Sequence, residues 1–269
     1  MMTARKAYLT GSTAVLSLTI ATAGGCGLAT KPAADQTPKA VAATPREALL
    51  KAVPDNRVGA YRFDIKGGTT PMSGVLDAPK KTVEIKIVEK EPSLGLTLSM
   101  TSLIIDKKGW MKIAFTPANL PGLPKLPKKW LLLDPSKVKD KDNSPLQYGD
   151  ETDPGYVSLL VSNSDGLKET SPGHYAGTTD LTRATKADVA DAKTLTALGG
   201  KAKAVPFTAV IDAEGHLSSA VVKIPAAGKA KAATYQVTYS GYGRTTTPAA
   251  PAPGAQTPAT SSVYDLLNG

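Results

Sequence analysis

An alternation of apolar and polar residues runs through much of the chain and predicts a protein built mainly of strands. In "YRFDIK", residues 61–66, every second side chain is apolar and those between are charged, as in a strand with one buried and one solvated face. The same period recurs in residues 82–90 and 94–100, and residues 103–115 predict a hairpin that turns at 106–109. We expect consecutive antiparallel strands whose shared apolar face must be covered.

The apolar members of this alternation are the candidates for the inner face of the sheet. Where helices leave part of that face open, the same side chains would line a cavity for an apolar ligand. The twelve candidates are Tyr61, Phe63, Ile65, Val83, Ile85, Ile87, Leu96, Leu98, Met100, Met111, Ile113 and Phe115.

Helix signals are fewer than strand signals. Thr44 precedes Pro45, and Glu47 follows three residues after the threonine, so the sequence predicts a capped helix that begins here. Residues 153–164 and 185–202 have the apolar spacing of two more helices, and a Gly-Gly pair ends the second.

The second half of the chain then repeats the strand theme. Residues 166–182 and 205–225 predict two hairpins, and residues 234–243 predict a final strand. Strands therefore outnumber helices. The predicted fold class is α+β, with one strongly curved antiparallel sheet, a half-barrel, that encloses helices and an apolar cavity.

A proline-rich stretch, residues 117–127, interrupts the strands. Its four prolines exclude a helix or a central strand, so we expect an extended loop. Leu120, Leu123 and Leu126 recur at every third residue, a spacing that aligns them on one side of a polyproline-like segment. The loop is either a lid over an apolar cavity or a segment packed on the core.

The start of the chain has the pattern of an export signal. Arg5 and Lys6 precede a short apolar run, residues 14–23, and small residues lead to Cys26, the only cysteine. The run has about half of the ~20 residues that a membrane-spanning helix needs. We expect Cys26 to carry a diacylglyceryl group after cleavage, because an unpaired thiol is a liability in an oxidising compartment. The alternative is an ordinary secretory signal with an incidental cysteine.

These patterns divide the chain into four parts. We expect a signal peptide over 1–25, a lipidated cysteine with a flexible tether over 26–43, and a folded domain over 44–243. Residues 244–269 form a tail rich in Pro, Ala and Thr that is either disordered or extended, with an apolar end able to dock as a short segment.

Charge and composition narrow the function classes. The formal net charge is +9, and the lysines either attract anionic lipid headgroups or form a solvated face. Aromatic residues make up 5% of the chain, too few for a platform that stacks single-stranded nucleic acid. With one cysteine the chain forms no internal disulfide, so a hydrophobic core must hold the fold.

Candidate catalytic and metal-binding groups are sparse. His174 and His216 lie beside turn glycines and are expected at the surface. The acidic runs 140–142 and 150–153 could hold a cation weakly, but we expect solvated loops. The sequence has neither the G-x-S-x-G nor the S-x-x-K motif with its partners. We therefore expect no enzyme, no cofactor and no metal site.

Several segments resemble a known group of proteins, the LppX/LprA/LprF/LprG family of envelope lipoproteins. They are the residues around Cys26, "YRFDIKGG", "KKWLLLDPSKV", "GHYAGTTDLT", "VPFTAVIDAEGHL" and "YQVTYSGYG". The resemblance covers about residues 44–243, and the long tail departs from it. It implies the half-barrel fold of the LolA and LolB carriers, anchoring at the outer face of the plasma membrane of a high-GC Gram-positive cell, and binding of acylated lipid or glycolipid. It implies no catalytic residues.

The leading hypothesis is accordingly a membrane-anchored carrier that helps to transport or place such a lipid. Its partners would be the membrane, through the N-terminal acyl chains, the lipid ligand and an envelope transporter; nucleic acid is not expected, and the protein is expected to be a monomer. The alternative is a non-catalytic, membrane-tethered regulatory or interaction module without a lipid ligand. A third hypothesis, an extracellular hydrolase, requires a Ser–His–carboxylate set brought together by the fold.

Overall fold

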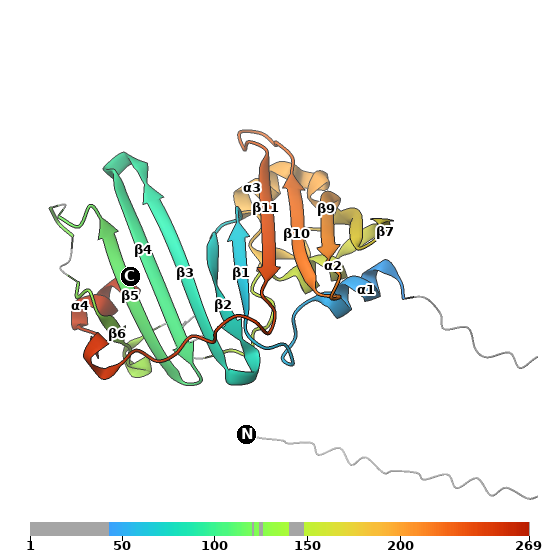
Figure 1. The fold of residues 1–269 in the computed structure, drawn as a ribbon. Coiled ribbons are helices and arrows are strands. Elements are labelled where there is room, and N and C mark those ends of the chain that lie inside the picture. Colours follow the sequence, from blue (N-terminus) through green and yellow to red (C-terminus); the bar gives the residue numbers. More distant parts are fainter. Residues whose placement is uncertain (1–42, 120, 124–125, 140–147, 269) are drawn as a thin grey trace, which may run out of the picture. The chain divides into compact units, whose positions relative to one another are not determined.

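One large sheet organises the domain. The computed structural model describes residues 43–119, 121–123, 126–139 and 148–268, which belong to one compact unit. Twelve strands in this part of the chain form a sheet in the order β12-β6-β5-β4-β3-β2-β1-β11-β10-β9-β8-β7 (Figure 1). The strands are β1 Tyr61–Lys66, β2 Met72–Asp77, β3 Thr82–Glu91, β4 Leu96–Ile105, β5 Lys108–Thr116, β6 Trp130–Leu132, β7 Ser164–Ser171, β8 His174–Thr179, β9 Val205–Ile211, β10 Leu217–Ile224, β11 Ala233–Ser240 and β12 Gln256–Pro258.

The predicted fold class is confirmed at the level of α+β with a large, mostly antiparallel sheet. The pair β12–β6 is parallel and the other pairs are antiparallel. The sheet is open, because β7 and β12 each pair with a single neighbour, and it is at most weakly curved (Figure 1). The strongly curved half-barrel that the sequence predicts is not confirmed by this shape.

Four α-helices accompany the sheet in the described residues, α1 Pro45–Ala52, α2 Val157–Ser162, α3 Ala192–Leu198 and α4 Ser261–Asn268. The start of α1 is as predicted: the Thr44 side chain accepts from the Glu47 amide, and the Glu47 carboxylate accepts from the Thr44 amide.

Two helices are shorter in the structure than the sequence predicts, and the difference has a physical reason in each case. The helix expected over 153–164 is only α2, because the chain enters it through a left-handed residue at Tyr156 (φ 49°). The helix expected over 185–202 is only α3, because the Asp191 carboxylate accepts from the Thr194 amide at 2.6 Å and so caps the helix there. Gly199 ends α3 as expected, with a positive φ.

Most of the predicted strands and hairpins are present in the structure. The hairpins β7–β8 and β9–β10 are confirmed, and the hairpin turn at 106–107 joins β4 to β5. Residues 96–105, however, form one uninterrupted ten-residue strand rather than the end of one strand and the start of another. Strand β12 was not expected at all, since three residues with a proline give no alternation to detect.

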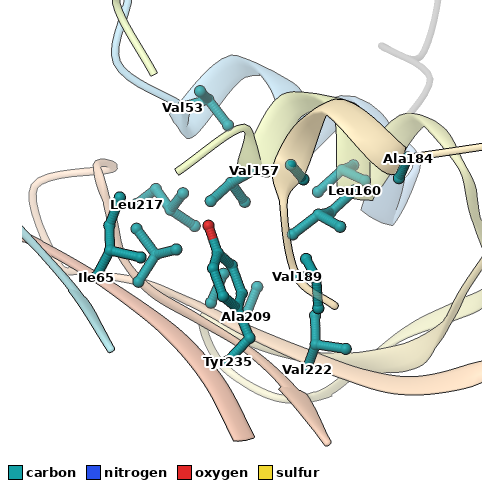
Figure 2. Packing of buried hydrophobic residues seen from close by; sticks show 14 of the residues in the cluster. Val53, Ile65, Val157, Leu160, Ala184, Val189, Ala209, Leu217, Val222 and Tyr235 are labelled. Atoms are coloured by element: carbon teal, nitrogen blue, oxygen red, sulfur yellow. The ribbon is translucent and has the colours of Figure 1, made fainter. Parts of the chain in front are cut away.

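The helices in the described residues take part in two separate cores, one over the half of the sheet that contains β1 and β8–β11 and one near the β6–β12 end. In the first core, α1 and α2 pack on β1 and β8–β11; Figure 2 shows Val157 and Leu160 of α2 facing Tyr235, Ala209 and Val222 of the sheet. In the second core, α4 packs at the other end, with buried members Met111, Ile113, Leu131, Leu133, Val138, Val263 and Tyr264.

The C-terminal tail is extended, and it is held to the domain along its length. After β11 it crosses the sheet toward β6 (Figure 1), and on the way the Thr247 hydroxyl contacts the Asp77 carboxylate. The Gln256 side-chain oxygen then accepts from the Trp110 indole at 2.7 Å. The apolar end docks as expected, because α4 inserts Val263 and Tyr264 into the second core.

Candidate functional site

The strand register places all twelve predicted inner-face residues on one face of the sheet. In antiparallel strands, directly opposed residues point to the same side. One row of opposed residues runs Met72, Ile87, Met100, Ile113 across β2–β5. The rows through Val83, through Ile85, through Leu98 and through Leu96 lie parallel to it, and β1 joins the same face through Tyr61, Phe63 and Ile65.

These twelve residues fall into two groups of six by burial. Tyr61, Phe63, Ile65 and Val83 lie in the first core, and Met111 and Ile113 lie in the second core, each at most 7% exposed. Their surfaces are covered by the protein's own side chains, so they offer nothing to a ligand. The remaining six, Ile85, Ile87, Leu96, Leu98, Met100 and Phe115, are only half-buried.

We call these six residues together with Met72 the apolar strip. Met72 and Ile85 pack against the first core. Leu98, Met100 and Phe115 pack against the second core. Ile87 and Leu96 belong to neither core, so the strip is the gap between them. Sequence reasoning missed Met72, although "MSGVL" has Met72 and Leu76 four residues apart, a spacing that places both on one side of a strand.

The outer end of the strip is bordered by carboxylates. Glu89 opposes Leu98 and Glu91 opposes Leu96, so both side chains belong to the face of the strip, and both are exposed. A molecule with its apolar part on the strip would bring its polar part close to two acceptors with negative charge.

The structure places the three lid candidates in different surroundings. Leu120 lies outside the described residues, Leu123 is half-buried, and Leu126 packs against the second core. Leu126 therefore behaves as part of a core in this structure, while the segment before it leaves the end of β5, the strand that carries Phe115. Cys26 also lies outside the described residues.

A cluster of buried tyrosines fixes the loop 148–156 over the first core. Tyr61 donates to the Thr152 carbonyl at 2.5 Å and Tyr235 to the Gly155 carbonyl at 3.0 Å. Tyr239 donates to the Asp153 carboxylate and accepts from the Gly155 amide at 3.2 Å. The expected solvated acidic loop is thus wrong for Asp153, which is 5% exposed and also accepts from the Ser158 amide at 2.7 Å.

This enclosure shifts the ionisation of the cluster. Burial raises the pKa of Tyr239 and of Tyr61 well above 10, and the nearby Asp153 charge acts in the same direction. Burial also raises the pKa of Tyr148 to about 12 and that of the Glu151 carboxyl above its ordinary value. The network holds protons on hydroxyls that act as donors, which suits a structural role in closing the first core.

The arrangement of a Ser, a His and an Asp near the β9–β10 turn does not make a hydrolase site. Asp212, His216 and Ser218 line one cleft of about 270 Å³, but the His216 Nδ1 lies 3.9 Å from the Asp212 carboxylate, beyond hydrogen-bond distance. The Ser218 hydroxyl donates to the Val210 carbonyl instead, and the His216 ring stacks on Tyr242 at 4.5 Å.

Other site types find no support in the described part of the chain. His174 is exposed beside its turn, as expected. Residues 43–119, 121–123, 126–139 and 148–268 bring together no group of three or more His, Cys, Asp or Glu side chains suited to a metal ion. Within the same residues, none of the helices has both the length and the apolar character to cross a membrane.

Comparison with known proteins leaves the site to be judged on its geometry. No protein-family model matches this chain, and no curated protein matches it.

Proposed function

We propose that the protein is an exported, membrane-anchored lipoprotein that binds an acylated lipid or glycolipid on the apolar strip and assists its transport or placement. The observation that carries the proposal is the strip itself. Seven apolar side chains lie side by side on one face of the sheet, between two cores that leave them half-exposed. A contiguous exposed apolar surface of this kind is typical of a binding site.

The energetics favour a ligand with more than one alkyl chain. Covering about ten methylenes of one chain contributes about 8 kcal/mol at ~0.8 kcal/mol for each CH₂ group. Association costs roughly 4–15 kcal/mol in lost freedom, so a single chain binds marginally. Two or three chains exceed that cost, which supports a diacyl or triacyl lipid as the ligand.

The carboxylates at the outer end of the strip favour a head group rich in hydroxyls. The Glu91 Oε1 already accepts from the Ser93 amide and hydroxyl, so Glu89 and the Glu91 Oε2 would accept hydrogen bonds from sugar hydroxyls, and both carboxylates would repel an anionic head. This supports the glycolipid within the proposed ligand class.

A half-barrel would form around the ligand in this proposal. Strands β3 and β4 are ten residues long, whereas β1 and β2 are six, so the β3–β4 hairpin extends past β2, while β5 continues beside β4 to the pair Thr97–Thr116. We infer that this ribbon, with β5 and the proline-rich segment after it, curls over bound alkyl chains and encloses them. The enclosed volume would then be the apolar cavity.

The anchor and the partners of the proposal rest on the sequence. The export signal and Cys26 support attachment at the outer face of the plasma membrane, with acyl chains on the cysteine. An envelope transporter would supply or receive the lipid, and the domain would act as a monomer.

Mass spectrometry of bound lipid tests the proposal. The full chain carries Cys26→Ser, which removes the anchor, and is expressed in a bacterium with a high-GC Gram-positive envelope. The purified protein is extracted with organic solvent, and the molar ratio of lipid to protein is measured. We expect about one acylated lipid for each chain, and several-fold less for Ile87→Asn. The matched control is Val88→Asn, at the next residue of β3 on the opposite face and 45% exposed; it should keep the lipid.

The interaction module without a lipid ligand is the second candidate. It is favoured by the burial of six of the twelve predicted cavity residues in the protein's own cores. Repeatedly lipid-free preparations, or equal lipid loss in Ile87→Asn and Val88→Asn, would overturn the carrier proposal and leave the module.

A further inference from the structure

An apolar cleft lies at the corner of the sheet where the β4–β5 turn, β6 and the C-terminal tail meet. Its volume is about 780 Å³, within the ~300–1,000 Å³ range of small-molecule sites. Leu132 and Pro258 supply an apolar surface beside the buried Trp110, and Leu132 is one of the few exposed large apolar side chains, at 37%. The cleft shares no residue with the apolar strip.

The rim of this cleft is basic. Lys107, Lys108 and Lys137 line it and are exposed, and none of them takes part in the ion pairs found between residues that the structure describes. The Lys137 ammonium lies 5.5 Å from the centre of the Tyr264 ring, which holds it over the wall of the cleft.

The neighbouring acids are already engaged. The Asp134 carboxylate accepts from the Ser136 amide at 3.0 Å and from its hydroxyl at 2.7 Å. The Asp106 carboxylate lies 3.7 Å from the Lys81 ammonium. Three ammonium groups therefore face the cleft against one lining carboxylate, and the local field favours an anion.

We propose that this cleft binds one alkyl chain of an amphiphile with an anionic head, the chain on Leu132 and Pro258 beside the buried Trp110 and the head among the three lysines. The ligand chemistry differs from that of the apolar strip, whose border is acidic. The proposal does not depend on the carrier function, and either can fail alone. The amphiphile has two sources: a free alkyl carboxylate, or an anionic lipid of a bilayer.

Tryptophan quenching tests the site in the full chain with Cys26→Ser. Trp130→Phe leaves Trp110 as the only tryptophan. The probe is 12-bromododecanoate below its micelle concentration, since a bromine in the cleft lies close enough to the Trp110 indole to quench its fluorescence. We expect saturable quenching, and binding about fivefold weaker (about 1 kcal/mol) after Lys107→Gln with Lys137→Gln. Lys168→Gln with Lys186→Gln, exposed lysines outside the cleft, should leave it unchanged.

Two further arms assign the head group and the source. Uncharged 12-bromododecanol should bind at least fivefold more weakly than the carboxylate. The second arm uses vesicles of phosphatidylglycerol with brominated chains. If only the vesicles quench Trp110, the ligand is a lipid of a bilayer. If 12-bromododecanoate quenches it, the ligand is a free amphiphile. Absence of quenching by both anions, or quenching that ignores the lysine pair, would overturn the proposal. Melting temperatures of all variants verify that they are folded.

Discussion

The substitution Asp153→Asn should destabilise the domain strongly, although it only replaces one carboxylate oxygen with an NH₂ group. The Asp153 carboxylate is buried and has two partners: the Tyr239 hydroxyl on one oxygen and the Ser158 amide, 2.7 Å away, on the other. An asparagine keeps one acceptor, so one of these donors must face an NH₂ group. Hydrogen bonds to charged groups contribute about 1.5–3 kcal/mol each, and we expect a loss of about 2–3 kcal/mol.

In a domain of this size, 1 kcal/mol shifts the melting temperature by about 2–4 °C, so Asp153→Asn should lower it by roughly 4–12 °C. Thermal unfolding followed by circular dichroism measures this. The matched control is Asp150→Asn: Asp150 is exposed with a positive φ of 57°, a conformation that asparagine tolerates. A double-mutant cycle with Tyr239→Phe should give a coupling energy of about 1 kcal/mol or more. A change under 1 °C for Asp153→Asn would refute the role given to the loop 148–156.

Three further predictions follow from other contacts. Gly155→Ala places a Cβ 2.6 Å from two methyl groups of β11 and should cost about 1–3 kcal/mol in chemical unfolding; Gly200→Ala, with nothing within 4 Å, should be near neutral. Gln256→Ala leaves the buried Trp110 indole without its acceptor, so hydrogen exchange in residues 256–268 should accelerate, and unchanged exchange would contradict the role given to this contact. Tyr148, with a pKa of about 12, should ionise late in absorbance at 295 nm; because unfolded tyrosines ionise near 10, stability should fall as the pH rises from about 10 to 12. Full ionisation of Tyr148 near pH 10 in the folded state would contradict the enclosure of the loop 148–156.

Local patterns were sufficient for the elements whose cause is local. The period of two placed Tyr61, Phe63 and Ile65 on one face of β1, and the Thr44–Glu47 pair marked the start of α1, because neighbours along the chain determine both features. The length of α2 depends instead on a loop held by tyrosines about 80–90 residues away in sequence, and no local pattern carries that information.

The same distinction limits the prediction of the site. Alternation identified which side chains share a face, and the register places them together. It could not tell Ile87 in the gap from Phe63 in a core, because burial depends on where the helices land. Nor could it find the cleft beside Trp110, whose wall includes Ala250, Pro258 and Tyr264 of the tail, more than 100 residues further along the chain.

The most direct test of the account is to see where an alkyl chain lies on the folded protein. The full chain with Cys26→Ser is incubated with a diacyl glycolipid that carries a photoreactive diazirine at one chain end, irradiated and digested with trypsin. We predict label on the peptides 87–90 and 91–107, at Ile87, Leu96, Leu98 or Met100, and its loss when unlabelled lipid competes. Label on Val88 and the opposite face alone, or no label that competes, would contradict a lipid site on the apolar strip.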